Sequence, residues 1–183
     1  MNEVELIRRQ LGVERQHAAE VSRACASALA ATGSADSEQL AAIESFRQAS
    51  VDYLVWSLSR FEEREQVFHD LLRSRLPADD LNRRAVETAL ALPGASREAL
   101  TKLEAALAKT GDTDTNATRW TEFLRFFGGP WSARRDEIDR LFERQAKIPD
   151  WRIVSAIDAD SIVDERGRYA RVKATLPAGI DIV

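Results

Sequence analysis

Residues 34–76 read SADSEQLAAIESFRQASVDYLVWSLSRFEEREQVFHDLLRSRL, a run without a glycine or a proline. Because interior glycine and proline are the residues that usually stop a helix, this segment is predicted to be one long helix, or a helix with one soft break. Its apolar residues recur at steps of three and four and their sums, so they form one stripe that faces a core over about 54 Å at 1.5 Å per residue. The stripe consists of Leu40, Val51, Leu54, Leu58, Phe61, Phe68, Leu72 and Leu76. Glu65 falls on the same line, where a carboxylate indicates either a salt bridge or a ligand.

A helix with a similar stripe is predicted before this segment. Its line of inward residues comprises Val4, Ile7, Leu11, Glu14, Ala18, Val21, Cys25, Ala28 and Thr32, and it ends at Gly33. The small residues in the second half allow close approach of another helix, and Tyr53 and Trp56 are the expected occupants of that space. The residues that follow are typical of a turn, with Ser37 as a candidate N-cap for the long helix. The two helices are therefore expected to be antiparallel neighbours.

The rest of the chain predicts shorter helices with clear breaks between them. They are expected over residues 77–91, 96–109, 119–127 and 131–148, with 110–118 as the most loop-like stretch. After these, residues 150–152 are expected to form a turn and 153–157 an extended run or a connecting turn. A final helix, capped by Asp158 or Asp160, is expected to run to about residue 175, and the closing isoleucines to pack on the bundle.

These patterns predict an all-α protein, an antiparallel helical bundle of the four-helix type with shorter peripheral helices. The bundle is assigned to residues 1–149. Residues 150–183 are assigned to a C-terminal helical extension that packs on the same domain. A chain of 183 residues suits a single domain and can bury a substantial core.

Composition narrows the function classes. The net charge of −4 and the interleaving of acidic residues with the arginines predict surface ion pairs rather than a surface for nucleic acid or anionic lipid. The uncharged apolar stretches are too short to cross a bilayer, so no membrane association is expected. Cys25 is the only cysteine, which excludes an intrachain disulfide and indicates a reducing, cytoplasmic location. Its position on the small-residue stripe favours a core residue over a nucleophile.

The strongest candidate site is a metal centre. It would combine Glu14 and His17 of the first helix with Glu62, Glu65 and His69 of the long helix, since Glu-x-x-His on one helix face delivers an oxygen and a nitrogen to one point. Geometry opposes the full set, because Glu14 is expected level with about residue 56, roughly 13 Å short of Glu65. The alternative is two surface histidines, with the carboxylates paired to arginines such as Arg64, Arg9 or Arg15. If Glu14 and Glu65 were unpaired, replacing either by leucine should stabilise the metal-free protein.

Residues 53–72, YLVWSLSRFEEREQVFHDLL, resemble the second helix of hemerythrin-like (HHE) bundles, and Glu14-Arg15-Gln16-His17 resembles the Glu-His that opens that family's first helix. The resemblance covers about 70 residues. It implies a helical bundle with an interior metal site. The histidine and glutamate ligands of the family's second helix would, however, fall on Arg60 and Arg64. With two histidines in the chain, the family's five-histidine diiron centre cannot be assembled, and His17 alone matches as a ligand.

Two function classes follow. The first is a hemerythrin-like bundle with a degenerate or rebuilt metal site that acts as a non-enzymatic binding, sensing or interaction protein, with a protein partner or a second copy of the chain. The second is a carboxylate–histidine metal-binding bundle, with iron or another divalent metal as cofactor. The sequence leaves the cofactor unknown, and a protein without one is an equal alternative. No P-loop, dinucleotide fingerprint or nucleophile elbow is present, so the chain is not assigned as an enzyme.

Overall fold

The structure is a computed structural model, and it describes residues 2–89, 98, 101–102, 105, 113–126 and 132–182. All regular elements within these ranges are helical, which confirms the all-α prediction. They are α1 (Glu3–Ala30), the 3-10 turn η1 (Ala31–Ser34), α2 (Ser37–Arg75), α3 (Leu81–Ala89), α5 (Thr113–Phe126), α6 (Ser132–Gln145), α7 (Ile148–Ser155) and α8 (Ala159–Ala174). Within the same ranges, every helix falls short of the length or the apolar character that a membrane span requires.

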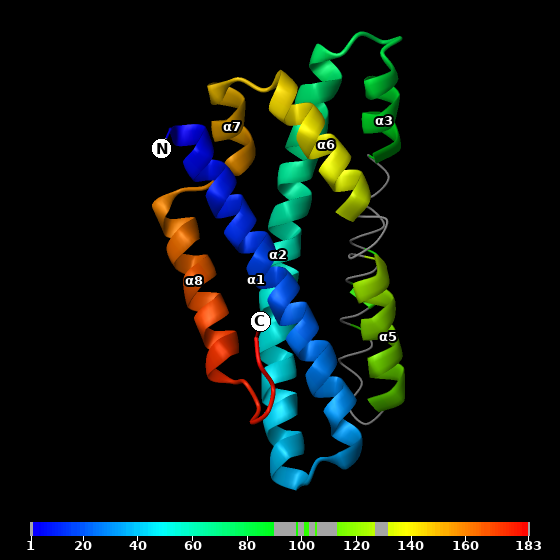
Figure 1. Cartoon of the computed structure of the whole chain (residues 1–183), viewed down its shortest axis with the longest axis vertical. Coiled ribbons are helices and arrows are strands. Elements are labelled where there is room, and N and C mark those ends of the chain that lie inside the picture. The colour runs from blue at the N-terminus through cyan, green and yellow to red at the C-terminus, as the bar shows by residue number, and fades with distance from the viewer. Residues whose placement is uncertain are drawn as a thin grey trace.

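The helices α1 and α2 form an antiparallel hairpin, as predicted, and the other elements pack around it (Figure 1). Each helix begins with a capping box, Asn2 with Glu5 in α1 and Asp36 with Gln39 in α2. These reciprocal bonds satisfy backbone N–H groups that have no partner within the helix. The cap of α2 lies one residue before the expected Ser37. The 39 residues of α2 form one helix without a break, so the prediction of a long helix is confirmed.

One core cluster lies between the second half of α1 and the first half of α2. Small residues of α1 allow the aromatic residues of α2 and α5 to approach, and the indole Nε1 of Trp120 donates a hydrogen bond of 3.0 Å to the Ser22 carbonyl. The cluster contains Ala18, Val21, Ala24, Cys25, Ala28, Leu29, Ile43, Phe46, Val51, Tyr53, Leu54, Leu58, Phe61, Trp120, Phe123 and Val172. Ile180 and Ile182 pack against it, as expected for the tail. Trp56 is only partly buried at its edge, whereas Tyr53 is fully buried.

A second cluster fills the other end of the hairpin. Its centre is an aromatic group in which the Phe68 and Phe142 rings lie 4.0 Å apart and the Phe142 and Trp151 rings 5.1 Å apart, both edge to face. The cluster contains Ile7, Leu11, Phe68, Leu72, Leu76, Val86, Leu141, Phe142, Trp151 and Val154. All stripe residues of α2 except Leu40, which is 42% exposed, are therefore buried in one cluster or the other.

Three local predictions are wrong. The stretch 110–118 was expected to be loop-like, but α5 begins at Thr113, because packing of Trp120 and Phe123 outweighs the low helix propensity of threonine and asparagine. The expected turn at 150–152 and the extended run at 153–157 are largely one helix, α7. Proline in its first turn is compatible with a helix, and Asp150 accepts a 2.6 Å hydrogen bond from the Lys147 N–H. Of the helix expected over 96–109, the structure describes residues 98, 101–102 and 105, which are helical, and the break at 128–130 lies outside the described residues.

The C-terminal segment is an integral part of the core. Asp158 caps α8, as expected, and α8 lies along α1 and α2 on the side of the hairpin opposite α5 (Figure 1). Trp151 and Val154 of α7 belong to the second cluster and Val172 of α8 to the first. Residues of α7 and α8 thus contribute side chains to both clusters.

Candidate functional site

An ion pair lies in the interior between α1 and α2. The Arg64 Nη1 atom donates a 2.5 Å hydrogen bond to Glu14 Oε2, and the two side chains are 5% and 2% exposed. Burial lowers the pKa of Arg64, while Glu14 acts in the opposite direction. The pair is incompletely satisfied, because Arg64 Nε, Arg64 Nη2 and Glu14 Oε1 are buried without a hydrogen-bond partner. The sequence left open that the carboxylates on the inward stripes pair with arginines such as Arg64, and this is confirmed for Glu14.

This contact reaches further along α2 than the expected level of Glu14. Glu14 was expected level with about residue 56, yet its partner lies eight residues further along α2. The long arginine side chain, together with that of the glutamate, spans the separation that backbone rise alone predicts. The side chain at position 64 thus reaches the inward stripe of α1, but it is an arginine and not a metal ligand.

A second polar network joins α1, α2 and α8. The Tyr53 hydroxyl donates a 2.8 Å hydrogen bond to Glu165 Oε1, and His17 Nδ1 lies 2.8 Å from the same oxygen. The Glu165 side chain is fully buried. The His17 ring stacks on Tyr169 with centroids 3.7 Å apart and planes 6° apart, and the Tyr169 hydroxyl donates a 2.5 Å hydrogen bond to Glu20. Burial and the neighbouring carboxylates raise the pKa of both tyrosines, so both phenols stay neutral hydrogen-bond donors.

The predicted metal ligands do not converge. Glu14 pairs with Arg64 and His17 with Glu165, while Glu62 and His69 are buried and Glu65 is half-buried. Burial lowers the pKa of His69 and so favours its neutral form. In the part of the chain that the structure describes, no three or more His, Cys, Asp or Glu side chains form a group that could hold a metal ion. The description of the histidines as surface residues is wrong for His69, which is 3% exposed.

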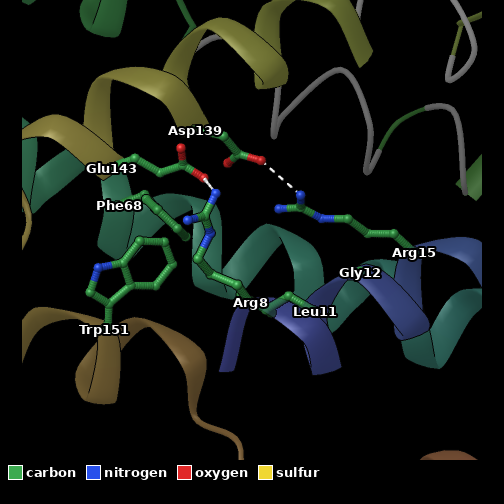
Figure 2. Close-up of a pocket in the computed structure, with 8 residues that line it drawn as sticks. All are labelled: Arg8, Leu11, Gly12, Arg15, Phe68, Asp139, Glu143 and Trp151. Atoms are coloured by element: carbon green, nitrogen blue, oxygen red, sulfur yellow. Dashed lines mark hydrogen bonds and ion pairs between the residues drawn. The ribbon is translucent and has the colours of Figure 1, made fainter. Parts of the chain in front are cut away.

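A pocket of about 190 Å³ opens between α1, α6 and α7. Figure 2 shows two ion pairs across it: Arg8 with Glu143, and Arg15 with Asp139 at 2.8 Å. Its remaining lining residues are Leu11, Gly12, Phe68 and Trp151. Each positive charge here faces a negative one, so the pairs hold α6 against α1 and leave no unmatched charge for a ligand.

A second pocket, of about 200 Å³, lies between α2 and α7. Its lining residues are Arg60, Glu63, Arg64, Val67, Ile153, Val154 and Ala156. The Arg60 guanidinium lies 5.0 Å from the centroid of the Trp56 ring, and its Nε and Nη2 atoms are buried without a hydrogen-bond partner. This pocket thus combines an apolar wall with two arginines that have hydrogen-bonding capacity to spare.

Glu165 is the functional candidate that sequence reasoning missed. A signal for it exists, because Ile162, Glu165, Tyr169 and Val172 recur at steps of three and four, which places a carboxylate on the inward stripe of α8. The same criterion had singled out Glu14 on α1. Nothing in the spacing, however, indicates that Tyr53, 112 residues earlier, is its partner.

Comparisons with protein-family models, with curated proteins and with solved structures found no match to this chain.

Proposed function

We propose that this chain is a non-enzymatic binding protein built on an antiparallel bundle of the four-helix type, resembling hemerythrin-like bundles with a degenerate metal site. The observation that carries the proposal is the buried Arg64–Glu14 pair. It stands in the interior between α1 and α2, at a position where the resemblance implies a metal ligand on α2.

The chemistry of the pair supports this assignment. A divalent cation at Glu14 would have to displace the Arg64 guanidinium, which would then be left in the interior without a counter-charge. Leaving a buried charge uncompensated costs about 3–5 kcal/mol, which any metal bound at Glu14 would have to offset. Arg64 therefore disfavours a cation at Glu14 by charge and by occupancy.

The test is the metal content of the purified protein, measured by elemental analysis, together with thermal melts with and without a chelator. We expect far less than one metal ion per chain and a Tm that the chelator leaves unchanged. The proposal fails if about one ion per chain is found or if the chelator lowers Tm. Loss of that ion in His17→Gln but not in His69→Gln would then place it at His17. A bound metal at a hundredfold excess over Kd would contribute about 2.7 kcal/mol of stability.

One observation favours the alternative of a carboxylate–histidine metal site. His17 Nδ1 and the buried Glu165 carboxylate lie 2.8 Å apart, and Glu165 Oε2 has no hydrogen-bond partner. An imidazole nitrogen and a carboxylate oxygen are suitable ligands for iron or zinc. The same measurement decides between the two proposals, because this alternative requires metal that is lost in both His17→Gln and Glu165→Gln.

A further inference from the structure

The pocket between α2 and α7 has two chemically different sides. Val67 of α2 and Ile153, Val154 and Ala156 at the end of α7 give it an apolar side. Arg60 and Arg64, one helical turn apart on α2, form the polar side. Val154 is 1% exposed and belongs to the second core cluster, so the apolar side is anchored in the fold.

The arginines hold more N–H donors than the protein itself satisfies. Arg64 is 5% exposed and donates to Glu14 through Nη1, while its Nε and Nη2 are buried without a hydrogen-bond partner. The Nε and Nη2 atoms of Arg60 are also buried without a hydrogen-bond partner, and the Trp56 ring gives Arg60 only a cation–π contact. Unsatisfied buried donors are costly, and an arginine fork matches the geometry of a carboxylate.

The surrounding acidic groups limit the charge that this pair can accept. Glu63 lines the pocket from an exposed position, where solvent screens it, and the Arg60 charge acts on Asp158, whose pKa is lowered mainly by hydrogen bonding with Ser161. Glu14 neutralises Arg64, and Glu63 and Asp158 are both exposed, where solvent screens their charges, so the positive charge that faces the pocket is that of Arg60. A singly charged anion therefore suits the site better than a polyphosphate.

We propose that this pocket binds a small monocarboxylate with an apolar tail. The tail lies against Val67, Ile153 and Val154, and the carboxylate accepts hydrogen bonds from Arg60, with the buried charge of Arg64 behind it. Because the spare N–H groups lie beneath the lining, the half-buried Arg60 turns from the Trp56 ring toward the ligand as it binds. The inference rests on the proposed function, since it gives a binding protein its class of ligand.

The size of the pocket sets the size of the ligand. A cavity of about 150 Å³ holds benzene, so about 200 Å³ accommodates a six-carbon ring with a carboxylate. Benzoate is accordingly the probe, and benzamide, a neutral molecule of nearly the same shape, is its matched control.

Calorimetric titration of the full chain tests the proposal. We expect one benzoate per chain and binding of benzamide that is about tenfold weaker or worse, because charge-assisted hydrogen bonds are lost. Trp56 provides a second readout, since its fluorescence should change on titration and the change should be absent in Trp56→Phe. Equal binding of the two probes, or no binding of benzoate, overturns the proposal.

Variants locate the binding. Arg60→Gln should weaken benzoate binding about tenfold or more. Arg168→Gln should not, although Arg168 lies over the same Trp56 ring at 5.0 Å and carries the same charge, because it does not line the pocket. Val67→Phe should abolish binding by filling the space, and circular dichroism checks that each variant is folded. Wild-type affinity in both Arg60→Gln and Val67→Phe refutes the site.

The two proposals fail separately. A metal-free protein that does not bind benzoate retains the proposed function and loses this ligand. A protein that holds about one metal ion per chain loses the proposed function, whatever its affinity for benzoate.

Discussion

Replacing one member of the Glu14–Arg64 pair should destabilise the protein strongly. Glu14→Leu leaves the Arg64 guanidinium in the interior without its counter-charge, and Arg64→Met does the same to the carboxylate, which is 2% exposed. Removing one partner of a buried pair costs about 3–5 kcal/mol. For a chain of this length, each kcal/mol lowers Tm by about 2–4 °C, so the expected loss is about 6–20 °C.

The double replacement Glu14→Leu/Arg64→Met should be more stable than either single variant. Two Arg64 nitrogens and one Glu14 oxygen lack hydrogen-bond partners in the folded protein, so the pair repays its desolvation incompletely. Replacing a whole buried pair with apolar side chains is often neutral, or stabilising by about 1–4 kcal/mol. The double-mutant cycle should therefore give a coupling energy of at least about 3 kcal/mol.

Urea unfolding followed by far-UV circular dichroism measures the cycle. The matched control is the same cycle on Arg8 and Glu143, which pair across α1 and α6 with side chains 51% and 37% exposed. An exposed pair should couple by about 1 kcal/mol or less. Single variants that cost less than about 1 kcal/mol, or a double variant as unstable as the sum of the singles, would refute the reasoning.

This result corrects the expectation drawn from the sequence. If Glu14 were unpaired, Glu14→Leu would raise the stability of the protein. Because Glu14 pairs with Arg64, the same replacement lowers it. Glu14→Leu is therefore destabilising whether or not a metal binds, so among these replacements it is the double variant that separates a charge pair from a metal ligand.

Three further predictions concern the core and its titratable groups. Leu58→Ala or Phe61→Ala should each cost about 2–5 kcal/mol in urea unfolding because both side chains are buried, and losses below about 1 kcal/mol at both would mean that the α2 stripe is misassigned. Burial lowers the pKa of His69, so below a pH of about 6.5 the unfolded state takes up more protons than the folded state. The free energy of unfolding should therefore fall from pH 7 to pH 5, and it should fall less steeply in His69→Leu. An equal pH dependence in both proteins would contradict this. Burial raises the pKa of the Cys25 thiol to about 12, so iodoacetamide at pH 8 should label it only after denaturation, and fast labelling of the native protein would show an open site.

Local patterns predicted the helices better than the contacts between them. The absence of glycine and proline over 34–76 and the apolar steps were sufficient for α1 and α2, and Asp158 was sufficient for the start of α8. The start of α5 at Thr113 was not predictable, because its polar residues are held in a helix by packing of Trp120 and Phe123.

The site was predictable only in part, for a geometrical reason. A carboxylate on an apolar stripe correctly marked Glu14 as an interior polar residue, and Arg64 was among the partners considered. Whether such a carboxylate meets a metal, an arginine or a tyrosine depends on register and side-chain reach, which residue spacing does not determine. Glu65 fell on the stripe but is half-buried, whereas Glu62, three residues earlier on the same helix, is buried.

The link between Glu165 and the α1–α2 hairpin bears on how the chain is made. His17 and Glu165 are 148 residues apart, so the network cannot close until α8 has been synthesised. About 100 residues separate the ends of α2 and α8, and at about 5–20 residues per second a ribosome needs about 5–20 s to add them. During those seconds the hairpin exposes the apolar face that α5 and α8 later cover, together with the Tyr53 hydroxyl. For that interval the nascent hairpin is open to aggregation and to chaperone binding.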